Sequence, residues 1–586
     1  MKIVDHIVEK VVSHGRTVYL AVMRKCPGLC ILLLLFFLVV GFIDPVREMM
    51  LGDEWAYVLT VRHLLGTGEY RLHDWAAANM PMQIYWGAFL AQVFGFSFTV
   101  LRFSTLILLL VGLIALYLLL RDFGTRDAEA SLLTLGVLSS PLVLLLGFTF
   151  QTDVQFLGWL ILALLLYTRA MRQQSYALMA LASVAAFAAI GTRQFGAAVV
   201  ASLFATWLFL EEQRLRRAPL YLVGLVLPLL MTVWQISLGV SRPTFSQKVR
   251  LAQQLAYLRD LPGFKVEILW RPTAILQYLG LFLLPLAPLL TVLVRNAWVN
   301  HDQKSRQEVG AARRRWRSRL WLAAWATYIT AGVCYGYFFH LPGVLMPTLA
   351  WLLPNSEFFF GFKKHVVLTI LTYGFAVFLG WLLLRRYLDR SQWHVLPREE
   401  WFVAMSGLAL LGLQLLYVQF YDVYLIQFVP FAVLALGQML HLWPRWCKAF
   451  TAMLCLITLV VSALWSRGNL EKAQAQWQAA EMARSTGAAP QQIAGNMTWS
   501  RYYGAFDEWI EEIGGSDAAA RYSGSNRMHD AFFTFLNKRY DRGKYMFTSS
   551  VPQPSDKSWQ ALGRVEYRDR SLRQRDIYLL MRTNAE

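Results

Sequence analysis

The chain has 586 residues, of which 56% are hydrophobic and only 16% charged, and its mean hydropathy is +0.41. Soluble globular proteins contain about 45–50% apolar and about 25% charged residues. This composition therefore excludes a cytosolic enzyme, a secreted disulfide scaffold and a disordered protein. Apolar stretches of roughly 20 residues, the length that spans a bilayer, recur from Leu29 to Leu464. We expect a polytopic α-helical membrane protein.

The formal net charge of +19 does not indicate a nucleic-acid partner, because of where the charge lies. Much of it falls in the N-terminal segment 1–28 and in short loops between apolar stretches, such as 313–319. Lys and Arg in short loops resist translocation and therefore act as orientation signals. The five cysteines lie in or beside the apolar stretches, so neither a disulfide framework nor a CxxC metal site is expected.

About thirteen spans are expected, the first at residues 29–43 with a cytoplasmic N-terminus. A polar loop over 44–80 follows, and then a semi-apolar segment, 82–97, which we interpret as a re-entrant or surface helix. The other twelve spans are expected in 99–120, 129–149, 154–170, 177–190, 195–210, 219–239, 272–294, 319–340, 364–385, 401–418, 423–443 and 449–466.

The loops that this count places in the cytoplasm are basic, as the positive-inside rule requires. One loop on the opposite face, 240–271, is also basic. It indicates either an error in the topology or an anion-binding segment, and we favour the second interpretation. The odd number of spans places residues 467–586 outside.

Residues 467–586 are expected to form a small extracytoplasmic α/β domain, separate from a membrane domain over 1–466. It should begin with a helix over 470–486 and contain strands in 544–549, 564–567 and 576–582. Within the membrane domain, residues 44–97 would form a first extracytoplasmic loop with surface helices.

Three sites hold ionisable groups beside the bilayer, where such groups are costly and are therefore functional candidates. Asp53 and Glu54 follow the first span, and on a helix they point about 100° apart, so one would face a site while the other braces the loop. Asp153 lies in a tight hairpin, and Arg193 interrupts a long apolar run. The simpler explanations are an acidic helix N-terminus, a helix cap and an interfacial arginine, respectively.

The expected topology places all three sites on the outer face, with Lys363 and Lys364 adding positive charge there. Acids and cations gathered on one face suggest catalysis at an anionic lipid headgroup. A carboxylate would activate an acceptor, and an arginine would bind phosphate through paired hydrogen bonds.

Five stretches, in this order, resemble motifs of the GT-C membrane glycosyltransferases, most closely bacterial proteins like glycosyltransferase family 39. That branch is related to the protein O-mannosyltransferases and to the lipid A aminoarabinose transferase. The stretches are DEWAY (53–57) with Arg62 and LGTGEY (65–70), NMPMQIYWGA (79–88), TDV (152–154), TR (192–193) and DVYLIQFVP (422–430). Met80 and Met82 depart from the pattern, because the family has lysine and proline at these positions.

The resemblance implies a GT-C fold and an inverting transfer of a hexose or pentose from a polyprenyl-phosphate donor. Asp53 would be the principal catalytic carboxylate, with Glu54 and Asp153 shaping the acceptor site or, for Asp53 and Asp153, holding a divalent metal cation. Arg193 would lie near the donor phosphate. The remaining residues implied at the site are Arg62, Lys363 and Lys364 for the phosphate, and Tyr57, Tyr85 and Tyr424 for the substrate.

The resemblance also implies a monomer in the bacterial inner membrane, in contact with membrane lipids and with no nucleic-acid partner. The acceptor would be a lipid, a glycan or a protein. Two other functions stay open. Broken helices and buried charges also occur in transporters, although no inverted repeat is found here. An inactive relative would bind lipid-linked sugar without turnover, which the replacement at Met80 keeps open.

Overall fold

The computed structural model describes thirteen stretches of the chain. They are residues 26–260, 271–272, 275–276, 278–280, 282–286, 288, 397–419, 421–437, 444–494, 497–522, 527–541, 543–549 and 558–583. The expected spans 319–340 and 364–385 lie outside these residues, as do parts of 272–294 and 423–443. Lys363 and Lys364 lie outside them too.

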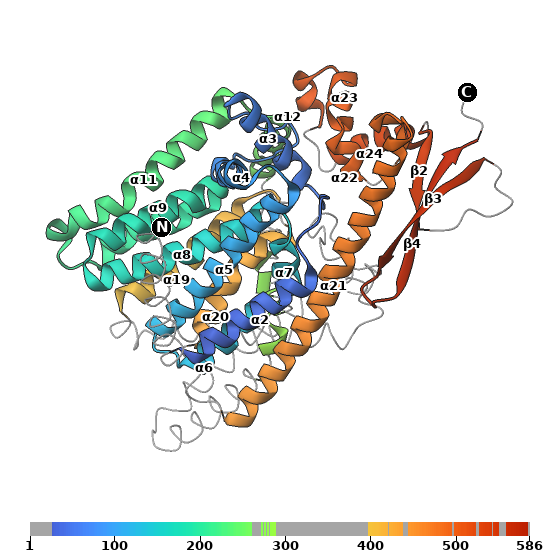
Figure 1. Cartoon of the computed structure of the whole chain (residues 1–586). Coiled ribbons are helices and arrows are strands. Elements are labelled where there is room, and N and C mark those ends of the chain that lie inside the picture. Colours follow the sequence, from blue (N-terminus) through green and yellow to red (C-terminus); the bar gives the residue numbers. More distant parts are fainter. Residues whose placement is uncertain are drawn as a thin grey trace, which may run out of the picture.

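The described chain is mostly helical, with a bundle of apolar helices below a C-terminal segment (Figure 1). Five of its helices are long and apolar enough to cross a membrane, or six if one bent pair counts as a single span. The number thirteen stays a prediction. The bundle helices are α2 (Pro27–Ile43), α5 (Phe98–Asp122), α6 (Asp127–Leu138), α7 (Pro141–Gly147), α8 (Thr152–Gln173), α9 (Tyr176–Thr192), α10 (Ala197–Ala205), α11 (Arg214–Ser241), α19 (Arg398–Leu416), α20 (Val429–Gly437) and α21 (Arg445–Ser485).

Two expected spans are not single straight helices. The stretch 129–149 is divided into α6 and α7, which are bent by 72°. Pro141 starts α7, and proline disfavours helical geometry in the residue before it, so the helix breaks at this point. The stretch 195–210 combines a 3-10 turn at Gln194–Gly196, helix α10 and a π-helix at Thr206–Leu210.

The first loop contains two helices, α3 (Glu54–Thr67) and α4 (Pro81–Phe94), and α4 corresponds to the surface helix expected in 82–97. Between them, the loop holds the start of α12 (Phe245–Arg259). The hydroxyl of Thr244 donates to the Ala76 carbonyl at 2.6 Å, and the Phe245 N–H donates to the Asp74 carboxylate at 2.8 Å. These bonds fix α12 beside the first loop.

Helix α21 has 41 residues and passes through residue 466, the expected domain boundary, without a break. Beyond it lie α22 (Met497–Tyr502), α23 (Ala505–Glu512) and α24 (Arg527–Asp541). The four strands are β1 (Ile493–Ala494), β2 (Tyr545–Thr548), β3 (Trp559–Arg568) and β4 (Gln574–Arg582). The sheet order is β1-β2-β4-β3, with only the β1–β2 pair parallel. The segments 544–549, 564–567 and 576–582 contribute to β2, β3 and β4, as predicted.

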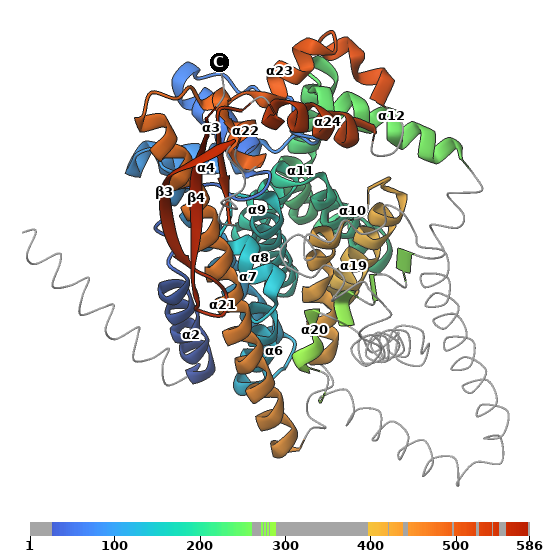
Figure 2. The same cartoon turned by 90° about the vertical axis from the view of Figure 1, so that its right-hand side faces the viewer.

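Aromatic packing joins the C-terminal segment to the first loop and α12. The ring of Phe506 lies 5.0 Å from that of Trp75, and the ring of Trp509 lies 5.7 Å from that of Phe245. Figure 2 shows α23 and α24 beside α12 at one end of the bundle, where α3 and α4 also lie. One end of the bundle is therefore covered by segments from the beginning, middle and end of the chain.

Candidate active site

Two buried side chains, Arg102 and Glu54, clamp the loops that carry the predicted acids. The Arg102 guanidinium donates to the carbonyls of Pro45, Arg47, Met49 and Phe148 at 2.7–3.0 Å. A cation satisfied by four backbone oxygens from two loops fixes their relative position. This arginine therefore joins the loop 44–53 to the loop 148–152.

Glu54 completes the clamp from the other side. Its two carboxylate oxygens accept hydrogen bonds from the N–H groups of Leu51 and Phe150, the second at 2.5 Å. Burial raises the pKa of Glu54, and Arg102 together with the two N–H groups offsets this only in part. Because both oxygens are engaged by backbone, Glu54 positions the loop and Asp53 next to it.

Asp53 is the N-cap residue of α3, and its side chain is 51% exposed. Its carboxylate oxygen Oδ1 lies 3.0 Å from Nη1 of Arg501, a buried arginine of α22. The Arg501 guanidinium packs over the ring of Trp75 at 4.4 Å, and burial lowers its pKa although Asp53 opposes this. The C-terminal segment thus places a cation on the predicted catalytic carboxylate.

Asp153 and Arg193 form the second ion pair of the site, with 2.7 Å between Oδ1 and Nη2. Asp153 lies in the first turn of α8, and Arg193 ends α9 in an extended conformation. Nε of Arg193 donates to the Thr152 hydroxyl at 2.9 Å, and its guanidinium lies 4.4 Å from the ring centroid of Tyr424. Three segments separate in sequence, 152–153, 193 and 424, therefore meet.

Tyr57 connects the two ion pairs. Burial raises the pKa of its hydroxyl, and the charges that act on it are those of Asp53, Arg193, Asp153 and Arg250. One helical turn after Asp53, it lies on the same face of α3. The predicted residues Asp53, Tyr57, Asp153, Arg193 and Tyr424 therefore occupy one neighbourhood.

Arg250 of α12 adds a second arginine to this neighbourhood. Burial opposes its charge, but Tyr421, Tyr417 and Tyr424 outweigh burial and raise its pKa. Its Nη1 atom is buried and has no hydrogen-bond partner among the described residues. A buried guanidinium nitrogen with no partner is costly, so this one is suited to an anionic ligand.

His529 of α24 approaches the site from the C-terminal segment, the residues that follow α21. Its ring packs edge-on against Trp75 at 5.5 Å. Burial, together with Arg250 and Arg501, lowers its pKa to about 4, although Asp53 opposes this. The imidazole is therefore neutral near pH 7 and available as a hydrogen-bond donor or acceptor.

Two predicted site residues have other contacts. Arg62 donates to the hydroxyl of Tyr502 at 3.2 Å on the surface. Tyr85 stacks on Tyr70 at 5.8 Å, and its side chain is half exposed. The structure gives neither a contact with the two ion pairs.

Sequence reasoning missed Arg501 and His529, and it singled out Arg250 only as one of several cations in the basic loop 240–271. The positive charge of that loop, which is unexpected on the outer face, was the one available signal for Arg250. No local pattern marks Arg501 or His529, because their role depends on how α22 and α24 pack against Trp75.

Residues 78–236 match the family model described as dolichyl-phosphate-mannose-protein mannosyltransferase. This match includes the predicted motifs at 79–88, 152–154 and 192–193. The chain therefore resembles this family over residues 78–236. No curated protein sequence matches it.

Two solved structures are similar in shape to this chain. ArnT from Cupriavidus metallidurans, bound to undecaprenyl phosphate, is 13% identical, with 96% of this chain and 99% of that chain covered and a TM-score of 0.40. AglB from Archaeoglobus fulgidus, an archaeal oligosaccharyltransferase in complex with an inhibitory peptide and a dolichol-phosphate, is 11% identical. The similarity covers 90% of this chain and 70% of that chain, with a TM-score of 0.45. Both likenesses are partial, since neither TM-score reaches 0.5.

The predicted divalent cation fits the donor set of this candidate site poorly. Among the residues that the structure describes, no group of three or more His, Cys, Asp and Glu side chains could hold a metal ion. The two candidate ligands, Asp53 and Asp153, are each ion-paired with an arginine. The chemistry proposed below therefore uses no metal.

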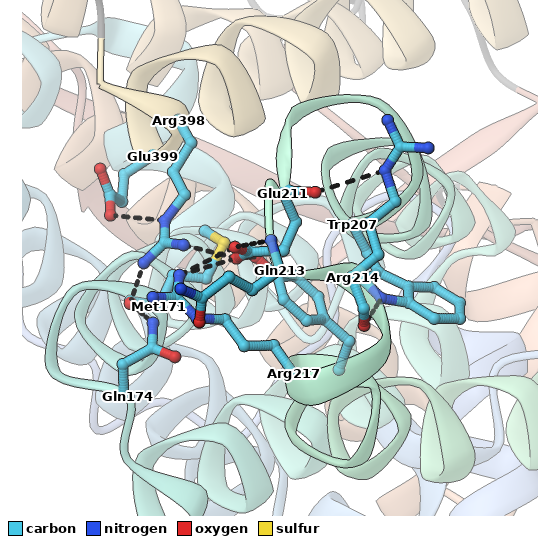
Figure 3. A network of polar contacts seen from close by, with 10 residues as sticks. Met171, Gln174, Trp207, Glu211, Gln213, Arg214, Arg217, Arg398 and Glu399 are labelled. Carbon is cyan, nitrogen blue, oxygen red and sulfur yellow. Dashed lines mark hydrogen bonds and ion pairs between the residues drawn. The ribbon is translucent and has the colours of Figure 1, made fainter.

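A second ion network, drawn in Figure 3, lies before the N-terminal end of α11, whereas α12 follows the C-terminal end of that helix. Glu211 is 2% exposed, and its carboxylate binds Arg217 at 2.8 Å, Arg398 and the Tyr221 hydroxyl at 3.1 Å. Burial opposes its ionisation, but the arginines and the Gln213 N–H outweigh burial and lower the pKa of Glu211. A cavity of about 320 Å³ adjoins the network and is lined by Glu211, Glu212, Arg217, Arg398 and Trp401, among others.

Proposed function

We propose that this protein transfers a sugar from a polyprenyl-phosphate donor to a lipid, glycan or protein acceptor. The reaction takes place at the membrane face where the first loop and the C-terminal segment lie, which is the outer face of a bacterial inner membrane. The match of residues 78–236 to the mannosyltransferase family model supports glycosyl transfer. The observation that carries the proposal is a half-exposed carboxylate, Asp53, in the same neighbourhood as Arg193 and Arg250. The second of these has a buried nitrogen without a partner in the part of the chain that the structure describes.

Asp53 accepts the proton of the acceptor nucleophile. The activated nucleophile attacks the anomeric carbon, and the bond from that carbon to the phosphate oxygen breaks on the opposite side, so the configuration inverts. Polyprenyl phosphate leaves with the electron pair. Positioned general bases contribute about 10²–10⁴-fold to such reactions.

Arg250 and Arg193 stabilise the departing phosphate. Nη1 of Arg250 gains the hydrogen bond that it lacks, and Arg193 supplies charge while Asp153 and Thr152 hold its orientation. Stabilising charge as it develops at the leaving group is often the largest single contribution to catalysis. With this pair, the phosphate site does not need the lysine that Met80 replaces.

The alternative is a protein that retains lipid-linked sugar without turnover. The contact between Asp53 and Arg501 favours it, because a carboxylate held by an arginine is a weaker base. In a transferase, the acceptor would have to displace Arg501 or bind beside it.

The test is release of polyprenyl phosphate from polyprenyl-phosphate-hexose by the purified protein in lipid, with cell-envelope extract as acceptor. Asp53→Asn should lower release by at least about 10²-fold. Asp507→Asn is the matched control, because Asp507 is 56% exposed and lies in the neighbouring α23. Equal release by wild type and Asp53→Asn would overturn the proposed role of Asp53, and donor retained without release would establish the binding protein.

A metal chelator added to the same assay tests the predicted cation. The proposal expects release to continue in its presence. Loss of release that Mg²⁺ or Mn²⁺ restores would return Asp53 and Asp153 to the role of metal ligands.

A further inference from the structure

The β3–β4 hairpin runs back along α21 toward the membrane. Gly563 of β3 lies against Met482, where a Cβ would come within 2.7 Å of the methionine methyl group. Arg570 in the turn lies against Gly468, where a Cβ would come within 2.5 Å of the Arg570 backbone nitrogen. The two contacts are about 21 Å apart along the helix and about 23 Å along the strand, so helix and hairpin are parallel in space. The turn, residues 569–573, is the end nearest the bundle.

This turn lies level with the C-terminal end of α2. Arg467 of α21 donates to the carbonyl of Phe42, at the end of α2, at 3.2 Å and to Glu471 at 2.8 Å. The other oxygen of Glu471 accepts from the N–H of Arg568 at 2.8 Å. Helix α2 corresponds to the first expected span, 29–43, and its exposed apolar side chains are Ile31, Leu34, Phe37, Leu38 and Phe42. Its last residues are the outer end of that expected span, and the turn is connected to them through Arg467 and Glu471.

The turn presents an apolar side chain where its backbone favours glycine. Leu572 has φ 58°, and its N–H donates to the Asp569 carbonyl at 2.8 Å. A left-handed residue at this point of a hairpin turn is usually Gly or Asn, since leucine is strained there. Leu572 is nevertheless 50% exposed. Leucine at this position costs free energy in water and recovers it where hydrocarbon is available.

The cations around Leu572 are mostly unpaired. Arg575 binds Asp569 at 3.1 Å, but Arg568, Arg570 and Arg573 form no ion pair with a described residue. The Asp569 carboxylate is further occupied by the N–H groups of Ser571 and Arg573. Positive charge of this kind, next to an apolar tip at the bilayer edge, is complementary to lipid phosphates.

We propose that the β3–β4 turn is a membrane-surface anchor, in which Leu572 inserts among lipid chains and Arg568, Arg570 and Arg573 bind the phosphates of anionic phospholipids. The anchor fixes the lower end of the sheet. It therefore sets the height above the membrane of α22 and α24, which carry Arg501 and His529. The inference does not depend on the reaction that the protein catalyses.

The test measures the depth of a nitroxide spin label in the full-length protein, after replacement of the five native cysteines. Labels at Leu572→Cys and, as a control, at Leu562→Cys are compared in bilayers that contain phosphatidylglycerol. Leu562 is 40% exposed on the same strand pair but lies away from the turn. The label at 572 should be accessible to oxygen and shielded from a water-soluble nickel complex, and the label at 562 should show the reverse. Equal nickel accessibility at the two positions would overturn the anchor.

The second arm tests the lipid headgroup. The label at 572 should lie deeper in bilayers with phosphatidylglycerol than in pure phosphatidylcholine, and Arg568→Gln with Arg573→Gln should remove that difference. Each arginine should contribute roughly five-fold to the preference for the anionic surface. A depth that is the same in both lipids would overturn the proposed phosphate contacts.

Discussion

Both ends of the bundle hold a buried carboxylate beside arginines, yet the two networks differ in what they leave unsatisfied. At one end, Glu211 engages Arg217, Arg398, Tyr221 and a backbone N–H, so its capacity is used within the protein. At the other end, Nη1 of Arg250 is buried without a partner among the described residues. A saturated network holds helices together, whereas an unsaturated one is prepared for a ligand.

Helix α11 separates the two networks. Glu211 lies just before α11, and α12, with Arg250, lies just after it, and the 28 residues of α11 span about 42 Å. Their chemistry can therefore be changed independently. The expected results below run from the largest effect to the smallest.

Arg193→Gln should have the largest effect on stability, because it leaves the carboxylate of Asp153 buried without its cation. Breaking a buried pair in this way costs about 3–5 kcal/mol. The double variant Arg193→Gln/Asp153→Asn should recover most of the thermal stability but not the release of polyprenyl phosphate. A double variant that recovers both would make this pair a structural network like that of Glu211.

Glu211→Gln should destabilise the opposite end by about 2–3 kcal/mol, since hydrogen bonds to a charged group are lost. Because the pKa of Glu211 is lowered in the folded state, its contribution is present above its ordinary value of about 4.3 and is lost as the pH falls. Melting curves from pH 7 to pH 3 measure this, with Glu212→Gln on the exposed neighbour as control. Release of polyprenyl phosphate per folded molecule should not change. A fall in this release would show that the Glu211 network affects the candidate active site.

Glu54→Gln should cost about 1–2 kcal/mol, because the amide places an N–H against one of the two backbone donors. The pH dependence has the opposite sign. The pKa of Glu54 is raised, so the stability from its neutral form is present below about 4.3 and lost as the pH rises through the raised value. The melting temperature of Glu54→Gln should not show this decline as the pH rises. A decline that persists in Glu54→Gln would assign it to another group.

Arg501→Gln should have the smallest effect, an increase of about three- to ten-fold in the turnover of donor, because Asp53 becomes a stronger base while its half-exposed carboxylate stays screened by solvent. Arg501→Lys should change turnover less, because it keeps the positive charge. The pH profile of turnover should shift in Arg501→Gln and not in Arg484→Gln, whose ion pair is on the surface. An unchanged profile would limit Arg501 to packing against Trp75.

The sequence predicts the helical membrane class, the surface helix α4 and the strands, because hydropathy and residue alternation are local properties. It also predicts that Asp53, Asp153 and Arg193 share one face. It does not predict that Glu54 binds two backbone N–H groups, since this depends on the meeting of separate loops at Arg102 and Phe150. The bend in the stretch 129–149 follows from Pro141, a local signal that the hydropathy of the stretch does not reflect. Arg501 could not be predicted, because 448 residues separate it from Asp53.

Binding of polyprenyl phosphate, without its sugar, tests the difference between the Glu211 network and the Arg250 site most directly. The affinities of wild type, Arg250→Gln and Arg217→Gln would be measured in the same lipid. Arg250→Gln should bind at least about ten-fold more weakly, as expected for the loss of a charge-assisted hydrogen bond, and Arg217→Gln should bind as the wild type does. Wild-type affinity in Arg250→Gln would contradict the assignment of Arg250 to the donor phosphate.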